Sequence, residues 1–567
     1  GDVNKTQTAA NYKSLGITAG NLVLPMNSNA HFIFNDLRFN MGQALAGNGS
    51  KLTIGERTTG TTGQQGQYIV GGGARVEYGI VSEDFTFTGN SDVTIKSGNY
   101  YMVCAGNYTM MRSGTSTFNG NAKITIDGGI MSGVNGGGYN RVNANGVAIT
   151  SIYNGDVEVN INDGSGIDSR VTVGSDLYIG RFIKNKITGT ATINLNTDKW
   201  KKATSTVIAP GYTGHSDDSA DFAKVVYNVN TTMTKSYFQG FDELNIQSGV
   251  ELTVPNNLEG KTRNPAAQGI VKFHGNSTLK TGTSGNLTAG SYEVNGNNNN
   301  LQIAKVEGTT TTYPINLYGG APTGTGKLTV GPYSNGATPA SNDVLIKYTT
   351  NPQVANKEHY ANGFPDYLLL DDKTAGTVYL NGRMVSVTYG GTTEYFPNIK
   401  EAMAKVTNAN TEYTVTVRKQ NYEVTDADVA AIQKATLAKK ISFTSKFTLE
   451  ALDPLETGES AGQEVTRTIK INKDLELGAE YLFTNVKFDY QSAGKNIFAN
   501  GKKVTFGKEG DTTDKGFELV NTTNAPTVFG GGKTTNVQNT EVVVNAGNFN
   551  NIYGGGNSGN VTGTATV

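Results

Sequence analysis

Apolar residues along most of this chain occupy every second position within short runs, and most runs end at glycine. Residues 93–95 precede Gly98 in this way, and residues 124–126 precede Gly128. A period of two places alternate side chains on opposite faces of a strand, so that one face can be buried. Glycine suits the turns that follow, because it adopts a positive φ without steric cost. The pattern predicts many short strands joined by tight turns.

Each strand and its glycine turn belong to a unit that recurs along the chain. In every copy a second apolar residue follows five positions after the last glycine of the first strand. The copies span residues 93–106, 124–137, 161–174 and 542–555. A sandwich of hairpins does not require equivalent positions to recur so closely. Stacked coils do, because one coil cannot bury its apolar face alone. We therefore predict an all-β fold, a parallel β-helix, with stacked asparagines forming ladders between coils.

A much longer repeat links the two ends of the chain. Residues 45–55 return as 497–507, residues 34–39 return as 483–488, and residues 92–100 return as 541–549. The three matches keep their order, and each second copy lies about 450 residues after the first. This arrangement is typical of a tandem array of large modules. We expect the strand and glycine pattern to continue after Val567, and a capping segment to precede Gly1.

The pattern changes near residue 385, where two helical periodicities appear. The first begins at Pro397, a favoured residue of a first helical turn, and the second begins at Thr425, a favoured N-cap. Their apolar faces are Ile399, Met403 and Val406, and Val429, Ile432 and Ala435. Solenoid ends need caps, because unpaired strands otherwise bind other chains. We predict a truncated β-helix module at 1–384, a small α/β capping segment at 385–455, and the start of a second β-helix module at 456–567.

Composition argues against several classes of function. Charged residues make up 17% of the chain and the formal net charge is −1, so no basic excess is present to neutralise the phosphates of a nucleic acid. No apolar run approaches the roughly 18 residues of a membrane-spanning helix. Cys104 is the single cysteine, which excludes an intrachain disulfide and a thiolate metal cluster. We expect neither nucleic-acid binding nor a membrane span in this stretch of chain.

Residues suited to catalysis or metal binding are sparse in the sequence. The four histidines, none of which has the spacing of a metal site or catalytic triad, are His31, His215, His274 and His359. The densest acidic cluster is Asp217, Asp218 and Asp221, whose carboxylates have a spacing that suits calcium; a solvated loop is the alternative. β-Helix enzymes need acids clustered on one face of the coils, and no such cluster is seen. We predict no catalytic residue, no enzymatic activity, and no cofactor other than calcium at these aspartates.

Two stretches of the sequence resemble known proteins. Residues 547–557, which contain Asn548, Phe549 and a run of glycines, are followed by a Gly-Thr-Ala-Thr-Val segment at 563–567. These residues resemble the adhesin-like repeat proteins of bacterial cell surfaces, and the resemblance extends to residues 80–200. Residues 395–403, leading to the strand pattern at 413–417, are similar to the first helix and strand of right-handed β-helix domains. The resemblance implies a long, modular, extracellular chain built from β-helices.

These patterns together predict a non-catalytic structural or adhesive repeat protein of the bacterial cell surface. Its expected partners are neighbouring modules of the same protein, and glycans or proteins of a host or cell surface. Tyrosines, of which the chain has 27, suit stacking on sugar rings where they are exposed, and half-buried strand positions are the alternative. Two other functions stay open: a β-helix carbohydrate-active enzyme, either a polysaccharide lyase or a hydrolase, and the tail fibre or spike of a phage.

Overall fold

The computed structural model describes residues 13–17, 22–24, 29–35, 37–41, 44–55, 59–60, 68–76, 84–111, 113–142, 149–174, 176–178, 184–202, 207–210, 222–261, 269–283, 287–436 and 438–567. In this part of the chain the fold is all-β with many-stranded parallel sheets, which confirms the predicted parallel β-helix class. The chain divides into two compact units. Unit 1 comprises residues 1–338, 344–363 and 371–378, and unit 2 comprises residues 339–343, 364–370 and 379–567. The predicted division into three parts stays a prediction.

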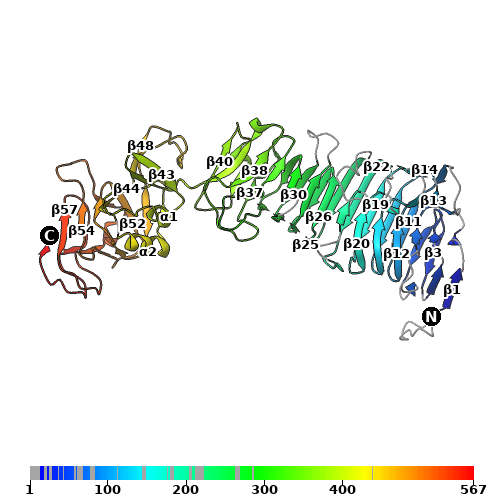
Figure 1. Ribbon diagram of the computed structural model, residues 1–567, viewed down its shortest axis with the longest axis horizontal. Coiled ribbons are helices and arrows are strands. Elements are labelled where there is room, and N and C mark those ends of the chain that lie inside the picture. Colours follow the sequence, from blue (N-terminus) through cyan, green and yellow to red (C-terminus); the bar gives the residue numbers. More distant parts are fainter. Residues whose placement is uncertain are drawn as a thin grey trace. The chain divides into compact units, whose positions relative to one another are not determined.

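Unit 1 consists of coils whose strands stack side by side in parallel sheets (Figure 1). One large sheet contains β3 (His31–Phe34), β6 (Lys51–Ile54), β11 (Ser91–Ile95), β15 (Ala122–Ile126), β19 (Val157–Ile161), β22 (Lys184–Leu195), β24 (Phe222–Val229), β27 (Glu243–Ile246), β30 (Ile270–His274), β33 (Ser291–Asn295) and β36 (Thr323–Gly324), joined by β10 (Phe85–Thr88), β14 (Gly114–Asn119) and β18 (Ile149–Asn154). The second contains β2 (Leu22–Val23), β5 (Ala44–Ala46), β8 (Tyr68–Val70), β12 (Asn99–Cys104), β16 (Ile130–Asn135), β20 (Ile167–Thr172), β23 (Val207–Ala209), β26 (Tyr237–Phe241), β29 (Asn257–Gly260), β32 (Leu287–Ala289), β35 (Ile315–Leu317) and β38 (Val344–Tyr348).

Three smaller sheets complete the coils of unit 1. They are β1 (Lys13–Ile17), β4 (Leu37–Met41) and β7 (Thr59–Gly60); β9 (Ala74–Val76), β13 (Tyr108–Met111), β17 (Tyr139–Val142) and β21 (Asp176–Tyr178); and β25 (Met233–Thr234), β28 (Glu251–Val254), β31 (Thr278–Thr281), β34 (Asn299–Gln302), β37 (Leu328–Val330) and β39 (Tyr360–Asn362). Two 3-10 turns, η4 (Pro352–Val354) and η5 (Lys357–His359), precede β39. Strands β40 (Leu368–Asp372) and β41 (Thr377–Asn381) each carry residues of both units.

The core of unit 1 is built from columns of apolar side chains in register. Val93 pairs with Leu52 on one side and with Ile124 on the other, and Ile124 pairs in turn with Val159. All of these side chains are buried. Because each coil covers the apolar face of the next, the period-two pattern of the sequence becomes a continuous core.

Asparagines form a second kind of column on the outer face of the same sheet. The side-chain amide of Asn194 donates to the carbonyl oxygen of Asn160 at 2.8 Å, Asn228 donates to Asn194 at 2.7 Å, and Asn245 donates to Asn228 at 3.0 Å. An amide carries both a donor and an acceptor, so one residue per coil satisfies its neighbours on both sides. The predicted asparagine ladders are therefore present.

Unit 2 begins with antiparallel pairing and then continues as a parallel coil stack. Strand β42 (Val385–Tyr389) pairs antiparallel with both β43 (Thr392–Phe396) and β44 (Glu412–Val417). From β44 the sheet runs in parallel through β46 (Lys440–Thr444), β51 (Tyr481–Phe483), β54 (Lys503–Phe506), β57 (Thr540–Val544) and β59 (Ala565–Thr566). The other elements are α1 (Ile399–Met403), α2 (Asp426–Lys434), η6 (Thr522–Asn524), a hairpin of β47 (Lys446–Thr448) and β48 (Glu464–Thr466), a sheet of β45 (Tyr422–Glu423), β49 (Thr468–Ile471), β52 (Val486–Tyr490) and β55 (Phe517–Leu519), and a sheet of β50 (Leu475–Glu476), β53 (Asn496–Phe498), β56 (Thr527–Phe529) and β58 (Asn551–Tyr553).

The long sequence repeat corresponds to the same arrangement of strands in both units. The sheets β1-β4-β7, β2-β5-β8-β12 and β3-β6-β11 of unit 1 have counterparts in β49-β52-β55, β50-β53-β56-β58 and β51-β54-β57 of unit 2. An ion pair also recurs between paired strands, at 3.2 Å between Lys51 and Asp92 and at 2.5 Å between Lys503 and Glu541. The sequence repeat is thus a structural module.

The turn at the centre of this module is reproduced in detail. Asn48 and Asn500 both have left-handed backbone, with φ values of 48° and 52°, and glycine follows each. The side-chain amide of Asn48 donates to the carbonyl of Leu24 at 3.1 Å, and that of Asn500 donates to the carbonyl of Leu477 at 3.3 Å. Asparagine tolerates this backbone region better than most residues, and its amide pins the turn to the neighbouring coil.

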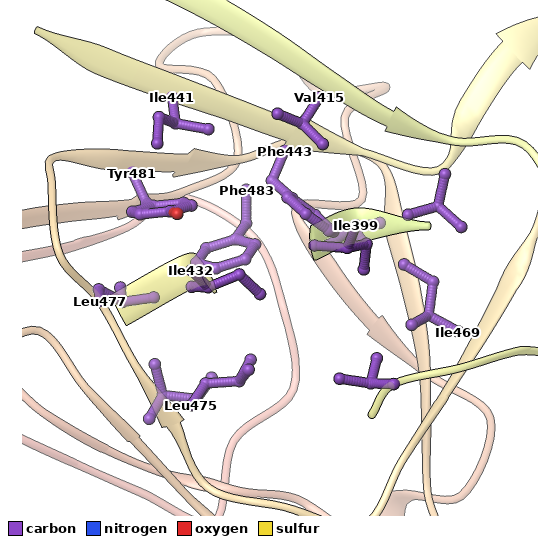
Figure 2. Close-up of a cluster of buried hydrophobic side chains, with 14 of the residues drawn as sticks. Ile399, Val415, Ile432, Ile441, Phe443, Ile469, Leu475, Leu477, Tyr481 and Phe483 are labelled. Carbon is purple, nitrogen blue, oxygen red and sulfur yellow. The ribbon is translucent and has the colours of Figure 1, made fainter. Parts of the chain in front are cut away.

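Both helices of unit 2 contribute side chains to the core of the coil stack. Figure 2 shows Ile399 of α1 and Ile432 of α2 close to Phe443, Leu475 and Phe483. All five are buried. The helices therefore share one apolar core with the first coils of unit 2.

Helix α1 begins at Ile399, two residues later than the sequence pattern predicted. Its N-cap is Asn398, whose side-chain oxygen accepts a hydrogen bond from the backbone N–H of Glu401 at 2.8 Å. Pro397 lies before the cap and Val406 lies beyond the helix end at Met403. The amide side chain of Asn398 satisfies a free N–H of the first turn, which proline cannot do.

The buried carboxylate of Asp428 ties the two helices together. It accepts hydrogen bonds from the backbone N–H and the hydroxyl of Thr425, at 3.0 and 2.8 Å, which completes the capping box of α2. It also accepts from the Tyr422 hydroxyl at 3.1 Å and from the backbone N–H of Lys400 in α1 at 2.8 Å. One acceptor group thus satisfies donors from two helix starts.

We expect Asp428→Asn to destabilise unit 2 by about 1–3 kcal/mol, because an amide replaces one acceptor oxygen with a donor that faces other donors. The loss of stability is measured by urea unfolding, monitored through hydrogen exchange in peptides that cover α1 and α2. The matched control is Asp426→Asn, two positions earlier, where the side chain is 90% exposed. Equal effects of the two substitutions would contradict this role of Asp428.

Candidate functional site: an arginine and carboxylate cluster

The predicted calcium ligands Asp217, Asp218 and Asp221 lie outside the described residues, so calcium binding there stays a prediction. Within the described ranges, no group of three or more His, Cys, Asp or Glu side chains is arranged to hold a metal ion. His31 bonds to the Thr53 hydroxyl at 2.7 Å, in keeping with a structural role.

Cys104 is fully buried in a cluster with Ala46, Val70 and Tyr108. Its sulfur lies 3.8 Å from the Asn135 amide nitrogen. Burial among apolar groups disfavours the thiolate, so Cys104 acts as core filler rather than as a nucleophile.

The most concentrated set of charges described in unit 2 gathers at the ends of three strands. Arg383 precedes β42, Arg418 follows β44, and Arg467 precedes β49. The antiparallel pairing of Val385 with Val417 brings the first two arginines together. Arg467 reaches the same place, because its Nε donates to the backbone carbonyl of Arg418 at 3.2 Å. All three arginines are buried.

The loop at 449–463, between the hairpin strands β47 and β48, supplies the compensating acids. Arg418 makes a bidentate contact with the Asp453 carboxylate. Its Nε donates to Oδ1 at 2.8 Å, and its Nη2 donates to Oδ2. Glu450 accepts from Arg418 at 3.0 Å, from Arg383 at 2.7 Å and from the Tyr395 hydroxyl at 2.6 Å. Two guanidinium groups thus face carboxylates of this loop.

Arg467 fixes the far end of the same loop. Its guanidinium donates to both carboxylate oxygens of Glu459, at 2.7 and 2.8 Å, and to the carbonyl of Pro454 at 2.7 Å. Planar, bidentate contacts of this kind are the strongest form of arginine–carboxylate pairing. The loop is therefore held at two separate points.

Two aromatic rings pack against the guanidinium groups of the cluster. The Tyr395 ring lies 3.6 Å from the Arg383 guanidinium carbon, and the Phe447 ring lies 4.3 Å from that of Arg418. The negative face of an aromatic ring attracts a cation, with more effect where water is excluded. The rings therefore help to hold like charges close together.

The electrostatics of the cluster keep its acids ionised. Burial raises the pKa of Asp453, but the hydrogen bonds from Arg418 and the Glu450 backbone, together with the positive charges of Arg418 and Arg383, outweigh burial, and the pKa lies below its usual value. Burial likewise raises the pKa of Glu450, and the bonds from Tyr395 and Arg383 bring it below the usual range. The hydrogen bond from Arg467 lowers the pKa of Glu459. Ionised carboxylates are strong acceptors for the guanidinium donors, so the charges of the cluster hold the loop in place.

The charges of this cluster were missed from the sequence because their partners are far apart along the chain. Arg383 and Asp453 are separated by 70 positions. One signal was available, since each arginine directly flanks an apolar strand pattern, as Arg418 does after Val417. Which loop returns to neutralise these arginines depends on the order of the coils.

The parallel sheets and coil stacking define the class of the protein as a parallel β-helix solenoid. No family model matches the chain, and comparison with curated proteins and with solved structures also gave no match. In the part of the chain that the structure describes, no helix is long and apolar enough to span a membrane. The fold class is therefore established by the topology alone.

In unit 1, the buried side chain of Lys235 has different surroundings from that of Lys261, which is also buried. Lys261 donates to the Phe222 carbonyl and to Asp242, both at 2.7 Å. Lys235, which is also buried, makes no hydrogen bond from its amine among the described residues. Its nitrogen lies 3.5 Å from the centre of the Trp200 ring. Burial lowers the pKa of Lys235 to about 7, while the ring face favours the cation.

We expect Lys235→Met to be more stable than the unsubstituted protein at pH 7, and the difference to shrink as the pH rises toward 10. An unfolded lysine titrates near pH 10.4, so between about 7 and 10 the unfolded chain binds more protons and stability rises with pH. The free energy of unfolding of each variant is measured by urea unfolding, monitored through the fluorescence of Trp200, the only tryptophan. Lys199→Met, at an exposed neighbouring position, is the control; a difference independent of pH contradicts the prediction.

We expect Asp453→Asn to release the loop at 449–463 at neutral pH, because two buried arginines lose a charged partner, a change that costs about 3 kcal/mol. In the unsubstituted protein the carboxylates stabilise the loop at any pH above their unfolded values near 4, and this contribution is lost as the pH falls through the lower folded values. Hydrogen exchange in loop peptides between pH 7 and 3 measures both effects. Glu456→Gln, on an exposed side chain of the same loop, should leave exchange unchanged.

Proposed function

We propose that this protein is a non-catalytic structural and adhesive repeat protein of the bacterial cell surface, exported from the cell. The observation that carries the proposal is the recurrence of one three-sheet module, with its asparagine turn and its ion pair, in both units. Repetition of a whole module adds length and valency, which an adhesive or spacer protein uses and a catalytic site does not need.

The outer surface of the coils supports the same proposal. Asparagines and opposite charges bond to one another from coil to coil, as Lys123 does with Glu158 at 3.3 Å and Asn196 does with Asn162 at 2.8 Å. Such columns satisfy their own polar groups and leave a regular, polar, nearly neutral face. Neighbouring modules of the same protein and surface glycans or proteins are the partners that this face suits.

We expect antibodies against the chain to label intact, unpermeabilised source cells, and the labelled chain to bind cell-surface material without converting it. Acidic and neutral polysaccharides are screened for both binding and turnover with the complete chain. Turnover that Asp217→Asn or Asp221→Asn abolishes would establish the carbohydrate-active enzyme instead. A stable homotrimer in light scattering would favour the phage fibre or spike.

A further inference from the structure

We propose that Arg383, Arg418 and Tyr395 form a binding site for an oxyanion, the carboxylate or sulfate group of an acidic polysaccharide, and that Glu450 occupies this site in the free protein. The inference rests on the proposed adhesive function, to which it adds a class of ligand. Glu450 is the internal group that the ligand replaces.

The side chain of Glu450 is held as a bound carboxylate would be. Arg383 and Arg418 each donate to one of its oxygens, at 2.7 and 3.0 Å, and the Tyr395 hydroxyl lies 2.6 and 2.7 Å from the two oxygens. Two guanidinium groups and a hydroxyl that converge on one carboxylate match the donor sets that recognise carboxylates and sulfates.

Glu450 differs from the other acid of this site in its access to solvent. The side chain of Glu450 is 50% exposed, whereas that of Asp453 is fully buried. Asp453 therefore belongs to the fixed frame of the site, and Glu450 is the group that an external anion can reach and replace.

Displacement of Glu450 does not require the loop to unfold. The backbone N–H of Glu450 donates to the Asp453 carboxylate at 2.7 Å, and Asp453 is itself clamped by Arg418. Arg467 holds the loop independently through Glu459. The Glu450 side chain can rotate outward while its backbone stays in place.

The site also has donor capacity that Glu450 does not use. The Nε of Arg383 is buried and donates no hydrogen bond among the described residues. A buried donor without a partner costs about 1–3 kcal/mol. A sulfate, or a sugar acid with an adjacent hydroxyl, presents more acceptor oxygens than a glutamate side chain, so it can satisfy this donor as well.

Charge balance gives the driving force once Glu450 is removed. Arg383 and Arg418 then share only Asp453 as an acidic partner, which leaves one positive charge in excess in a largely buried site. An uncompensated buried charge is strongly unfavourable, so an external anion that enters the site restores the balance.

The test measures binding of inorganic sulfate and of a uronic-acid polysaccharide to the complete chain by isothermal titration calorimetry at constant ionic strength. We expect Glu450→Ala to bind sulfate at least tenfold more tightly than the unsubstituted protein, and the added substitution Arg383→Met to remove this gain. Glu464→Ala is the matched control, since its side chain is 62% exposed and pairs with Lys446 instead. Hydrogen exchange in the loop at 449–463 verifies that each variant keeps the cluster folded.

Two results would overturn the site. One is a folded Glu450→Ala variant with no gain in sulfate binding, and the other is a gain that survives Arg383→Met. If the variant binds sulfate but not the polysaccharide, the polymeric ligand is rejected and a free anion is the occupant. Labelling of intact cells is measured separately, so failure of this site and failure of the adhesive function give different results.

Discussion

The whole structure depends on the in-register stacking of parallel coils. A strand whose apolar side chains alternate has only one face to bury, and in this chain the next coil provides the cover, as Ile124 does for Val93. The same register aligns the polar positions, so the columns of asparagine and of paired charges follow from the column of apolar residues beside them. Local sequence and long-range packing thus impose the same repeat.

The first strands of unit 2 are arranged differently from the stacked coils that follow them. Its sheet starts with the antiparallel strands β43 and β42 and becomes parallel only from β44 onward. Helices α1 and α2 place Ile399 and Ile432 in the same core, and Asp428 joins their first turns. Apolar, polar and helical contacts meet within a short stretch of chain.

The arginine cluster adds a different kind of contact to this region. It is a buried set of balanced charges rather than an apolar core, and breaking one member leaves the others uncompensated. Asp453 and Glu459 fix the loop, whereas Glu450 is partly exposed to solvent. The cluster thus combines a buried carboxylate with one that solvent can reach.

Much of the fold was predictable from the sequence, whereas the cluster was not. Period-two apolar runs and glycine turns gave the strands, and the match of Asn48 with Asn500 revealed the module, because both signals are local or strictly repeated. The start of α1 was placed too early, since the amide of Asn398 caps the helix in preference to Pro397. The pairing of Arg418 with Asp453 depends on where the β47–β48 loop returns, and no local pattern records that.

The in-register pairing of neighbouring coils also limits how such a chain changes its length. A deletion of Asp92 in β11 would move Val93 and Ile95 to the outer face and break their columns on both sides, because side chains alternate along a strand. Insertion of a complete coil would disturb neither neighbour, since each contact is made between adjacent coils. The length of this protein can therefore change by whole coils, and residues can be added or removed at the corners between strands.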